Sequence, residues 1–184
     1  MSARTRGKVT AVLHWAHAGV ILGLFALGWF MLGLPKGPDK AELFAAHKSL
    51  GLCAAALLLA RMAWRLWSRS KSRGGLAATP MLGLHQALLY ITLFLTPLFG
   101  YLATSFGRHP VRFFSLKLPK LGTPDEALSQ FFAICHSTCG WILLALVILH
   151  LATAIRLRQH RTTPGPGLGE SCRPKRSNAP SGAQ

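Results

Sequence analysis

The sequence predicts an all-α membrane protein, a bundle of four transmembrane helices with both termini in the cytoplasm. Of its 184 residues, 51% are hydrophobic and 14% are charged, and the hydrophobic residues come in long blocks that do not alternate with polar ones. A nearly charge-free block of about 18 residues or more is typical of a membrane span. These two observations predict the helices, and the distribution of the cations predicts their orientation.

Four blocks reach or approach this length. We expect the spans at about residues 11–34, 43–64, 81–104 and 131–155. The second block gives the weakest signal because Lys48 interrupts it near one end. The first is too long for a cleaved signal peptide and has no small-residue cleavage pattern. We therefore expect one transmembrane domain over residues 1–160, followed at 161–184 by a disordered basic tail that is rich in Pro, Gly and Ser.

Positive charge is concentrated on one side of these spans. The net charge of +16 would suggest a nucleic-acid partner for a soluble protein. With the N-terminus inside, however, fourteen of the 21 Lys and Arg residues lie on the cytoplasmic side, whereas four of the five acids lie outside. This asymmetry follows the positive-inside rule. Basic segments beside anionic lipid headgroups account for the charge, so we expect a lipid partner and no nucleic acid.

Histidines inside the predicted spans are the strongest candidates for function, because ionisable groups in a membrane interior are costly. His136 and His150 lie fourteen residues apart in the run CHSTCGWILLALVILH, so they share one helix face at a separation of about 21 Å. By their distance from the predicted span ends, His14 lies at the inner level of His150, and His47 lies at the outer level of His136. The sequence thus predicts two level-matched pairs, one near each membrane face.

A haem iron with two axial histidines fits a pair of neutral imidazoles that face each other inside a helix bundle. Two alternatives remain open at this point. The rings could be hydrogen-bonded packing residues, or they could line a proton or metal path, which would make the chain a histidine-lined transporter. Zinc usually takes about four ligands, and a proton relay usually includes buried carboxylates, whereas none of the five acids lies inside a predicted span.

Cations near these histidines are candidates for contacts with haem propionates. Arg61 lies fourteen residues after His47, so it shares the His47 face of its helix at the inner level. It could bind a propionate of an inner haem or extend to the cytoplasmic interface as a snorkelling side chain. On the outer side, Lys48, Arg108 and Lys117 could neutralise propionates. Together with Arg112 they could also attract a small anion.

Three further histidines have weaker signals. His17 lies one turn deeper than His14 on the same helix face, and could replace it as a ligand or be a packed, hydrogen-bonded ring. His85 begins the third span on the cytoplasmic side and is a rival partner for His14. His109 lies in the outer connection of about residues 105–130, a length that favours a functional lid, and could carry protons for a bound quinone.

These residues resemble the bacterial cytochrome b561 family from about residue 5 to residue 160. The resemblance rests on HW at His14, on HKSLG…R…R from His47 to Arg65, on the outer-loop stretch GRHPVRFFSLKLP, and on the spacing of His136 and His150. It implies two non-covalent haem b groups with His14 and His150 as axial ligands of the cytoplasmic-side haem, and His47 and His136 as those of the periplasmic-side haem.

The resemblance also implies a function and a location. It implies electron exchange with the ubiquinone pool of a bacterial inner membrane and, in some members, oxidation of superoxide at the outer face, that is, a superoxide:ubiquinone oxidoreductase. We therefore predict transmembrane electron transfer through two bis-histidine haems. An alternative is a cytochrome b subunit that anchors a partner dehydrogenase or hydrogenase and passes electrons between it and quinone. The histidine-lined transporter would differ from both in being colourless.

Overall fold

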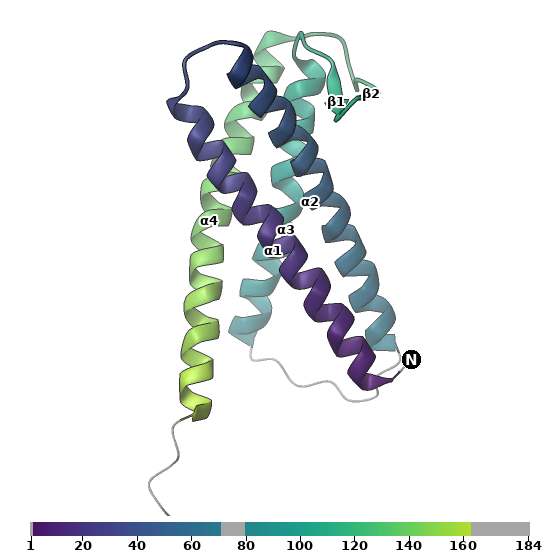
Figure 1. The fold of residues 1–184 in the computed structure, drawn as a ribbon, viewed down its shortest axis with the longest axis vertical. Helices are drawn as coiled ribbons and strands as arrows, with labels where there is room; N and C mark the ends of the chain where they lie inside the picture. Colours follow the sequence, from purple (N-terminus) through teal and green to yellow (C-terminus); the bar gives the residue numbers. More distant parts are fainter. Residues whose placement is uncertain (1, 71–79, 163–184) are drawn as a thin grey trace, which may run out of the picture. The chain divides into compact units, whose positions relative to one another are not determined.

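The computed structural model describes residues 2–70 and 80–162. Over these residues it contains four long helices and one short antiparallel hairpin (Figure 1). In chain order the elements are α1 (Ala3–Gly33), α2 (Pro38–Ser70), α3 (Pro80–Phe106), β1 (Val111–Phe113), β2 (Leu116–Leu118) and α4 (Glu126–Thr162). Each helix is long and apolar enough to cross a membrane. The prediction of an all-α, four-helix membrane protein is confirmed, while the cytoplasmic position of the termini stays a prediction. The predicted tail at 161–184 lies almost wholly outside the described residues.

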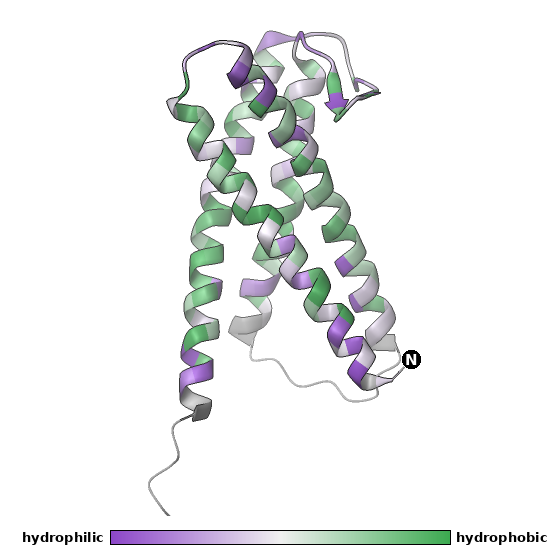
Figure 2. Cartoon of the chain, viewed as in Figure 1, coloured by the Kyte–Doolittle hydropathy of each residue, from purple (hydrophilic) through white to green (hydrophobic). Residues whose placement is uncertain are grey.

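Local signals explain why α1, α2 and α4 begin before their apolar blocks. The Ser2 hydroxyl caps α1 by accepting the Thr5 N–H at 3.2 Å. α2 begins at a proline, a residue suited to the first helical position because its missing N–H has no intrahelical partner there. A carboxylate oxygen of Asp125 accepts the Leu128 N–H at 3.0 Å and so caps α4. Figure 2 shows the result, with hydrophobic residues along the middle of the helices and hydrophilic residues toward their ends.

Most large apolar side chains of the described residues face outward. Only a few hydrophobic residues in this part of the chain are fully buried, among them Ala54, Leu58 and Leu143. By contrast, Trp29 and Trp141 are 71% and 57% exposed. In a bilayer the lipid tails are as apolar as these side chains, so outward hydrophobic residues need no protein cover. The polar groups that do lie inside the helices therefore carry most of the information about function.

The chain divides into two compact units, Met1–Val147 and Ile148–Gln184. The first holds α1, α2, α3, the hairpin and the first part of α4. The second holds the last part of α4, where the Thr153 hydroxyl donates to the His150 carbonyl at 2.9 Å. Because the two units are separate bodies, the predicted pairing of His14 with His150 stays a prediction.

The outer connection folds into the β1–β2 hairpin, which is fastened to α2. Arg112 and Lys117 are opposite each other in its register. At the turn, Phe114 has a positive φ of 50°, and its N–H donates to the hydroxyl of Ser49 on α2 at 2.8 Å. Ser49 is 1% exposed, and Val111 is 3% exposed. The hairpin is thus held against α2 next to His47.

Candidate functional site

The structure brings His47 of α2 and His136 of α4 side by side within the first unit. Their ring centroids are 6.1 Å apart and their planes are nearly perpendicular, at 86°. The sequence placed them together only by matching their depths, and their role as ligands stays a prediction. Imidazole nitrogens bind first-row metals at about 2 Å, so two axial rings on one metal have centroids about 6 Å apart. The observed separation therefore fits a shared metal.

Hydrogen bonding sets the tautomer of His136. Its Nδ1 lies 2.8 Å from the carbonyl oxygen of Thr96 on α3. A carbonyl only accepts, so Nδ1 carries the proton and a neutral ring keeps its lone pair on Nε2. Histidines that bind metals typically donate their other ring N–H to such an acceptor, which fixes the ring and increases its basicity. His136 is therefore prepared to be a ligand through Nε2.

Two glycines leave room for the paired rings. A Cβ built on Gly100 of α3 would lie 3.0 Å from Nδ1 and 3.2 Å from Cε1 of His136, and one on Gly28 of α1 would lie 3.6 Å from Cε1 of His47. The Nδ1 atom of His47 is buried and has no hydrogen-bond partner among the described residues. A buried ring nitrogen without a partner costs free energy, and a bound group that contacts this nitrogen would remove the cost.

Two cavities adjoin this pair and supply different environments. The larger, of about 520 Å³, is lined mainly by apolar side chains of all four helices together with His47 and His136. The smaller, of about 260 Å³, shares both histidines but is also lined by Lys48 and Arg112. An apolar macrocycle with carboxylate substituents needs both kinds of environment. The histidine pair, its glycines and its cavities therefore fit a haem held by His47 and His136.

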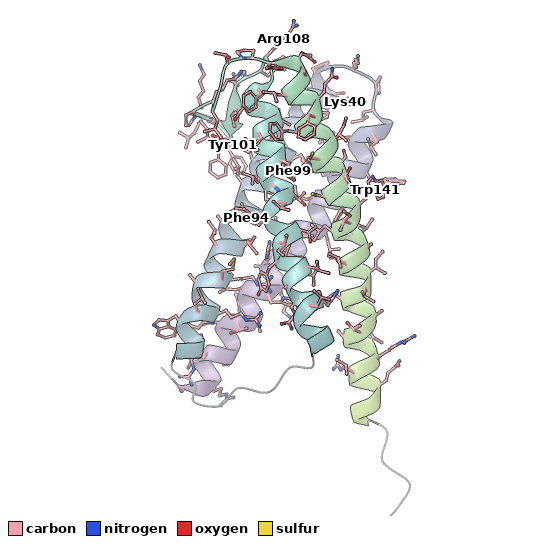
Figure 3. All side chains as sticks on the ribbon, turned by 180° about the vertical axis from the view of Figure 1, so that it is seen from behind. Lys40, Phe94, Phe99, Tyr101, Arg108 and Trp141 are labelled. Carbon is pink, nitrogen blue, oxygen red and sulfur yellow. The ribbon has the colours of Figure 1, made fainter. Side chains whose placement is uncertain are left out.

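The structure separates the predicted outer cations into two groups. Lys48 is half-buried and Arg112 is exposed, and both line the smaller cavity. The Nε atom of Arg108 lies 3.7 Å from Oε2 of Glu126, and the Arg108 side chain is 82% exposed. Figure 3 shows it extending away from the helices. Lys117 is exposed on β2. Of the four predicted cations, Lys48 and Arg112 are thus the ones that lie at a cavity beside the histidines, while Lys40, which was not predicted, lines the larger cavity.

At the other end of the first unit, Arg61 of α2 contacts two histidines of α1. Its Nη1 lies 3.0 Å from Nδ1 of His17, and its Nη2 lies 3.2 Å from Nδ1 of His14. His17 is 1% exposed. The sequence placed Arg61 at the inner level but offered only a propionate or the interface as its partner. The spacing of His14 and His17 on one helix face was the signal from which this contact could have been predicted.

A second arginine extends this polar cluster, and the sequence analysis used it only as part of a motif, without a functional role. Arg65 donates to the Tyr90 hydroxyl at 3.3 Å and to Oε1 of Gln86 at 3.2 Å. The guanidinium groups of Arg65 and Arg61 lie 5.6 Å and 6.0 Å from the centre of the Tyr90 ring, within the range of cation–π attraction. Among the weaker candidates, His85 is half-buried on α3 and His109 is exposed in the outer connection.

Comparison with known proteins adds an independent result. Residues 5–162 match the family model described as prokaryotic cytochrome b561. The chain is also 29% identical over 164 residues to cytochrome b561 homolog 2 of Escherichia coli strain K12, a match that covers 82% of each protein. The family implies haem b as cofactor, in agreement with the fit of the histidine pair. The chain therefore belongs to the prokaryotic cytochrome b561 family, which indicates transmembrane electron transfer in a bacterial inner membrane.

Proposed function

We propose that the chain carries electrons across the membrane through two haem b groups, one held by His47 and His136 near the outer face and one held by His14 and His150 near the inner face. The observation that carries the proposal is the outer pair, with its ring centroids 6.1 Å apart and the Nδ1 atom of His136 on a backbone carbonyl. When bound, the two haems supply one-electron redox chemistry.

At the outer site, residues of the chain hold the cofactor, orient its ligands and balance its charge. His47 and His136 fix the position of the cofactor from two helices, and the Thr96 carbonyl orients one of them. The apolar lining of the larger cavity excludes water, which strengthens every electrostatic interaction inside. Lys48 and Arg112 line the smaller cavity, where their positive charges would balance the carboxylates of the haem propionates.

We further propose that a small anion, superoxide, delivers electrons at the outer face and that ubiquinone accepts them. The support is the position of Lys48 and Arg112, which line a cavity that both histidines also line. A cavity lined by one sign of charge raises the local concentration of an oppositely charged donor and so its rate of encounter. This proposal includes the orientation predicted from the charge asymmetry, with both termini in the cytoplasm.

The test is to count haem in the detergent-purified protein by pyridine extraction and to record reduced-minus-oxidised spectra. We expect two haem b per chain in the wild type. His47→Ala and His136→Ala should each retain one haem, and it should be the same haem in both variants. His109→Ala, a change of an exposed histidine, is the matched control and should retain two.

Other results would contradict the proposal. If His47→Ala and His136→Ala removed different haems, the pairing would be wrong. One haem in the wild type would remove the inner site. A folded wild-type protein without haem, made with haem available, would instead favour the histidine-lined path. Co-purification of a dehydrogenase or hydrogenase would favour the anchoring subunit.

A further inference from the structure

One guanidinium holds two histidines at the inner end of the first unit. Arg61 contacts Nδ1 of His17 at 3.0 Å and Nδ1 of His14 at 3.2 Å. Its charge also lies 6.0 Å from the centre of the Tyr90 ring. Either histidine could serve as an iron ligand on sequence grounds, because the two lie one turn apart on the same face of α1. The contacts with Arg61 and the burial of each ring together distinguish them.

The contact with Arg61 sets the position of the proton on each ring. A guanidinium has only donors, so Nδ1 of each ring accepts from Arg61. A neutral imidazole that accepts at Nδ1 carries its proton on Nε2, and it has no lone pair left on Nε2 for a metal. His136 is the opposite case, because its Nδ1 donates to the Thr96 carbonyl. A neutral histidine therefore either keeps Arg61 at Nδ1 or binds iron through Nε2.

The surroundings of the two rings differ. His17 is 1% exposed and makes the shorter of the two contacts, so it is enclosed by protein and has little room to turn. His14 is half-buried and lies edge-on to the exposed Trp15, at 5.6 Å between ring centroids. A ligand must be able to turn toward its cofactor, and His14 is the less enclosed of the two rings.

We propose that His17 is a positioning residue and not a ligand: it holds Arg61 beside the inner haem site. His14 leaves the guanidinium, its proton moves from Nε2 to Nδ1, and Nε2 is then free to bind the iron. The release of His14 frees Nη2 of Arg61, whose N–H groups can then donate to a haem propionate. Tyr90 also stabilises the guanidinium through the cation–π contact. This inference rests on the proposed function and assigns a role within its inner site.

The experiment compares His14→Ala, His17→Ala and His17→Asn by haem count and by redox titration of each haem. The Asn side chain is chosen because its amide oxygen can accept from Arg61, as Nδ1 does, but it is not expected to bind iron. We expect one haem in His14→Ala, which also assigns the inner haem, and two haems in both His17 variants.

The redox titration measures positioning rather than folding. In the wild type, the positive charge of Arg61 destabilises the oxidised inner haem. Without His17, Arg61 is no longer held beside the cofactor, so this destabilisation is weaker. We expect the reduction equilibrium of the inner haem to shift about tenfold toward the oxidised form in His17→Ala, which is about 59 mV for a one-electron couple. In His17→Asn the potential of the inner haem should return most of the way to the wild-type value. The outer haem should not change and serves as the internal control for folding.

A double-mutant cycle completes the test. If His17 acts through Arg61, then Arg61→Gln should cause a similar shift, and the double variant should shift no further than Arg61→Gln alone. Additive shifts would overturn the inference. So would loss of the inner haem in His17→Asn together with its retention in His14→Ala, because His17 would then be the ligand. An unchanged inner potential in His17→Ala would also overturn it. A wild-type protein without an inner haem would contradict the proposed function instead.

Discussion

Replacing Gly100 by alanine tests the tuning of the outer site most directly. The added methyl group would lie 3.0 Å from Nδ1 and 3.2 Å from Cε1 of His136, which is closer than ordinary van der Waals contact. The His136 ring must move by a few tenths of an ångström or rotate, and its 2.8 Å hydrogen bond to the Thr96 carbonyl must lengthen or break. The variant therefore perturbs this bond without removing either predicted ligand.

The size of the effect can be worked out from this hydrogen bond. A neutral hydrogen bond contributes about 0.5–1.5 kcal/mol. The donated Nδ1 proton makes the ring more basic and so favours the oxidised iron. Its loss should raise the midpoint potential of the outer haem, by up to about 60 mV if the whole contribution distinguishes the two redox states, because 59 mV corresponds to a tenfold change for one electron.

Spectroelectrochemical titration of the purified protein is the assay. The inner haem should keep its potential in the same sample and so serves as an internal reference. Gly23→Ala is the matched control, because a methyl group there meets no atom within 4 Å and brings the same gain in helix propensity, about 0.5–1 kcal/mol. An unchanged outer potential in Gly100→Ala, or a shift confined to the inner haem, would refute the reasoning.

Two further predictions concern the outer face. Replacing Lys48 and Arg112 together with glutamine should slow reduction of the outer haem by an anionic reductant and flatten the salt dependence of the rate, which stopped-flow spectroscopy can measure. Arg108→Gln is the control and should change neither, since Arg108 lies beside Glu126 and is exposed. Ser49→Ala removes the acceptor of the Phe114 N–H and should destabilise the hairpin locally by about 1–3 kcal/mol. Hydrogen exchange of the β1 and β2 amides should then accelerate, and equal exchange in the two proteins would show that the contact does not hold the hairpin.

Hydrophobic block length was enough to predict the four helices, because a membrane selects for long apolar segments whatever their detailed packing. Block length also gives depth, and depth brought His47 and His136 to the same level before any contact was known. The ends of the helices were harder to predict from the sequence. α1 starts at Ala3, well before its apolar block, because capping and helix propensity act on polar residues that hydropathy ignores.

The contacts that fix the roles of individual side chains depend on rotation and register, which spacing alone does not give. The acceptor for His136 is the backbone carbonyl of Thr96. Every residue has such a carbonyl, so the residue types in the sequence do not predict this contact. Arg112 and Arg108 look alike in the sequence. The hairpin register and the contact of Phe114 with Ser49 bring Arg112, and not Arg108, to the smaller cavity.

Different groups lie beside the predicted ligands at the two proposed sites, and this difference predicts the order of their midpoint potentials. At the outer site, Nδ1 of His136 donates to a carbonyl, which favours the oxidised iron. At the inner site, the guanidinium of Arg61 brings a positive charge, which favours the reduced iron. Of the two outer cations, Arg112 is exposed, so salt screens its charge, whereas the half-buried Lys48 is the one that opposes this order.

We therefore expect the outer haem to have the lower midpoint potential, so that electrons from a donor at the outer face move inward to the site of higher potential. Redox titration of the wild-type protein, with the inner haem assigned through His14→Ala, measures this order directly. Arg61→Gln should narrow the gap by lowering the inner potential, and Gly100→Ala should narrow it by raising the outer one. A wild-type protein in which the outer haem has the higher potential would show that the hydrogen bond of His136 and the charge of Arg61 do not set the direction of transfer.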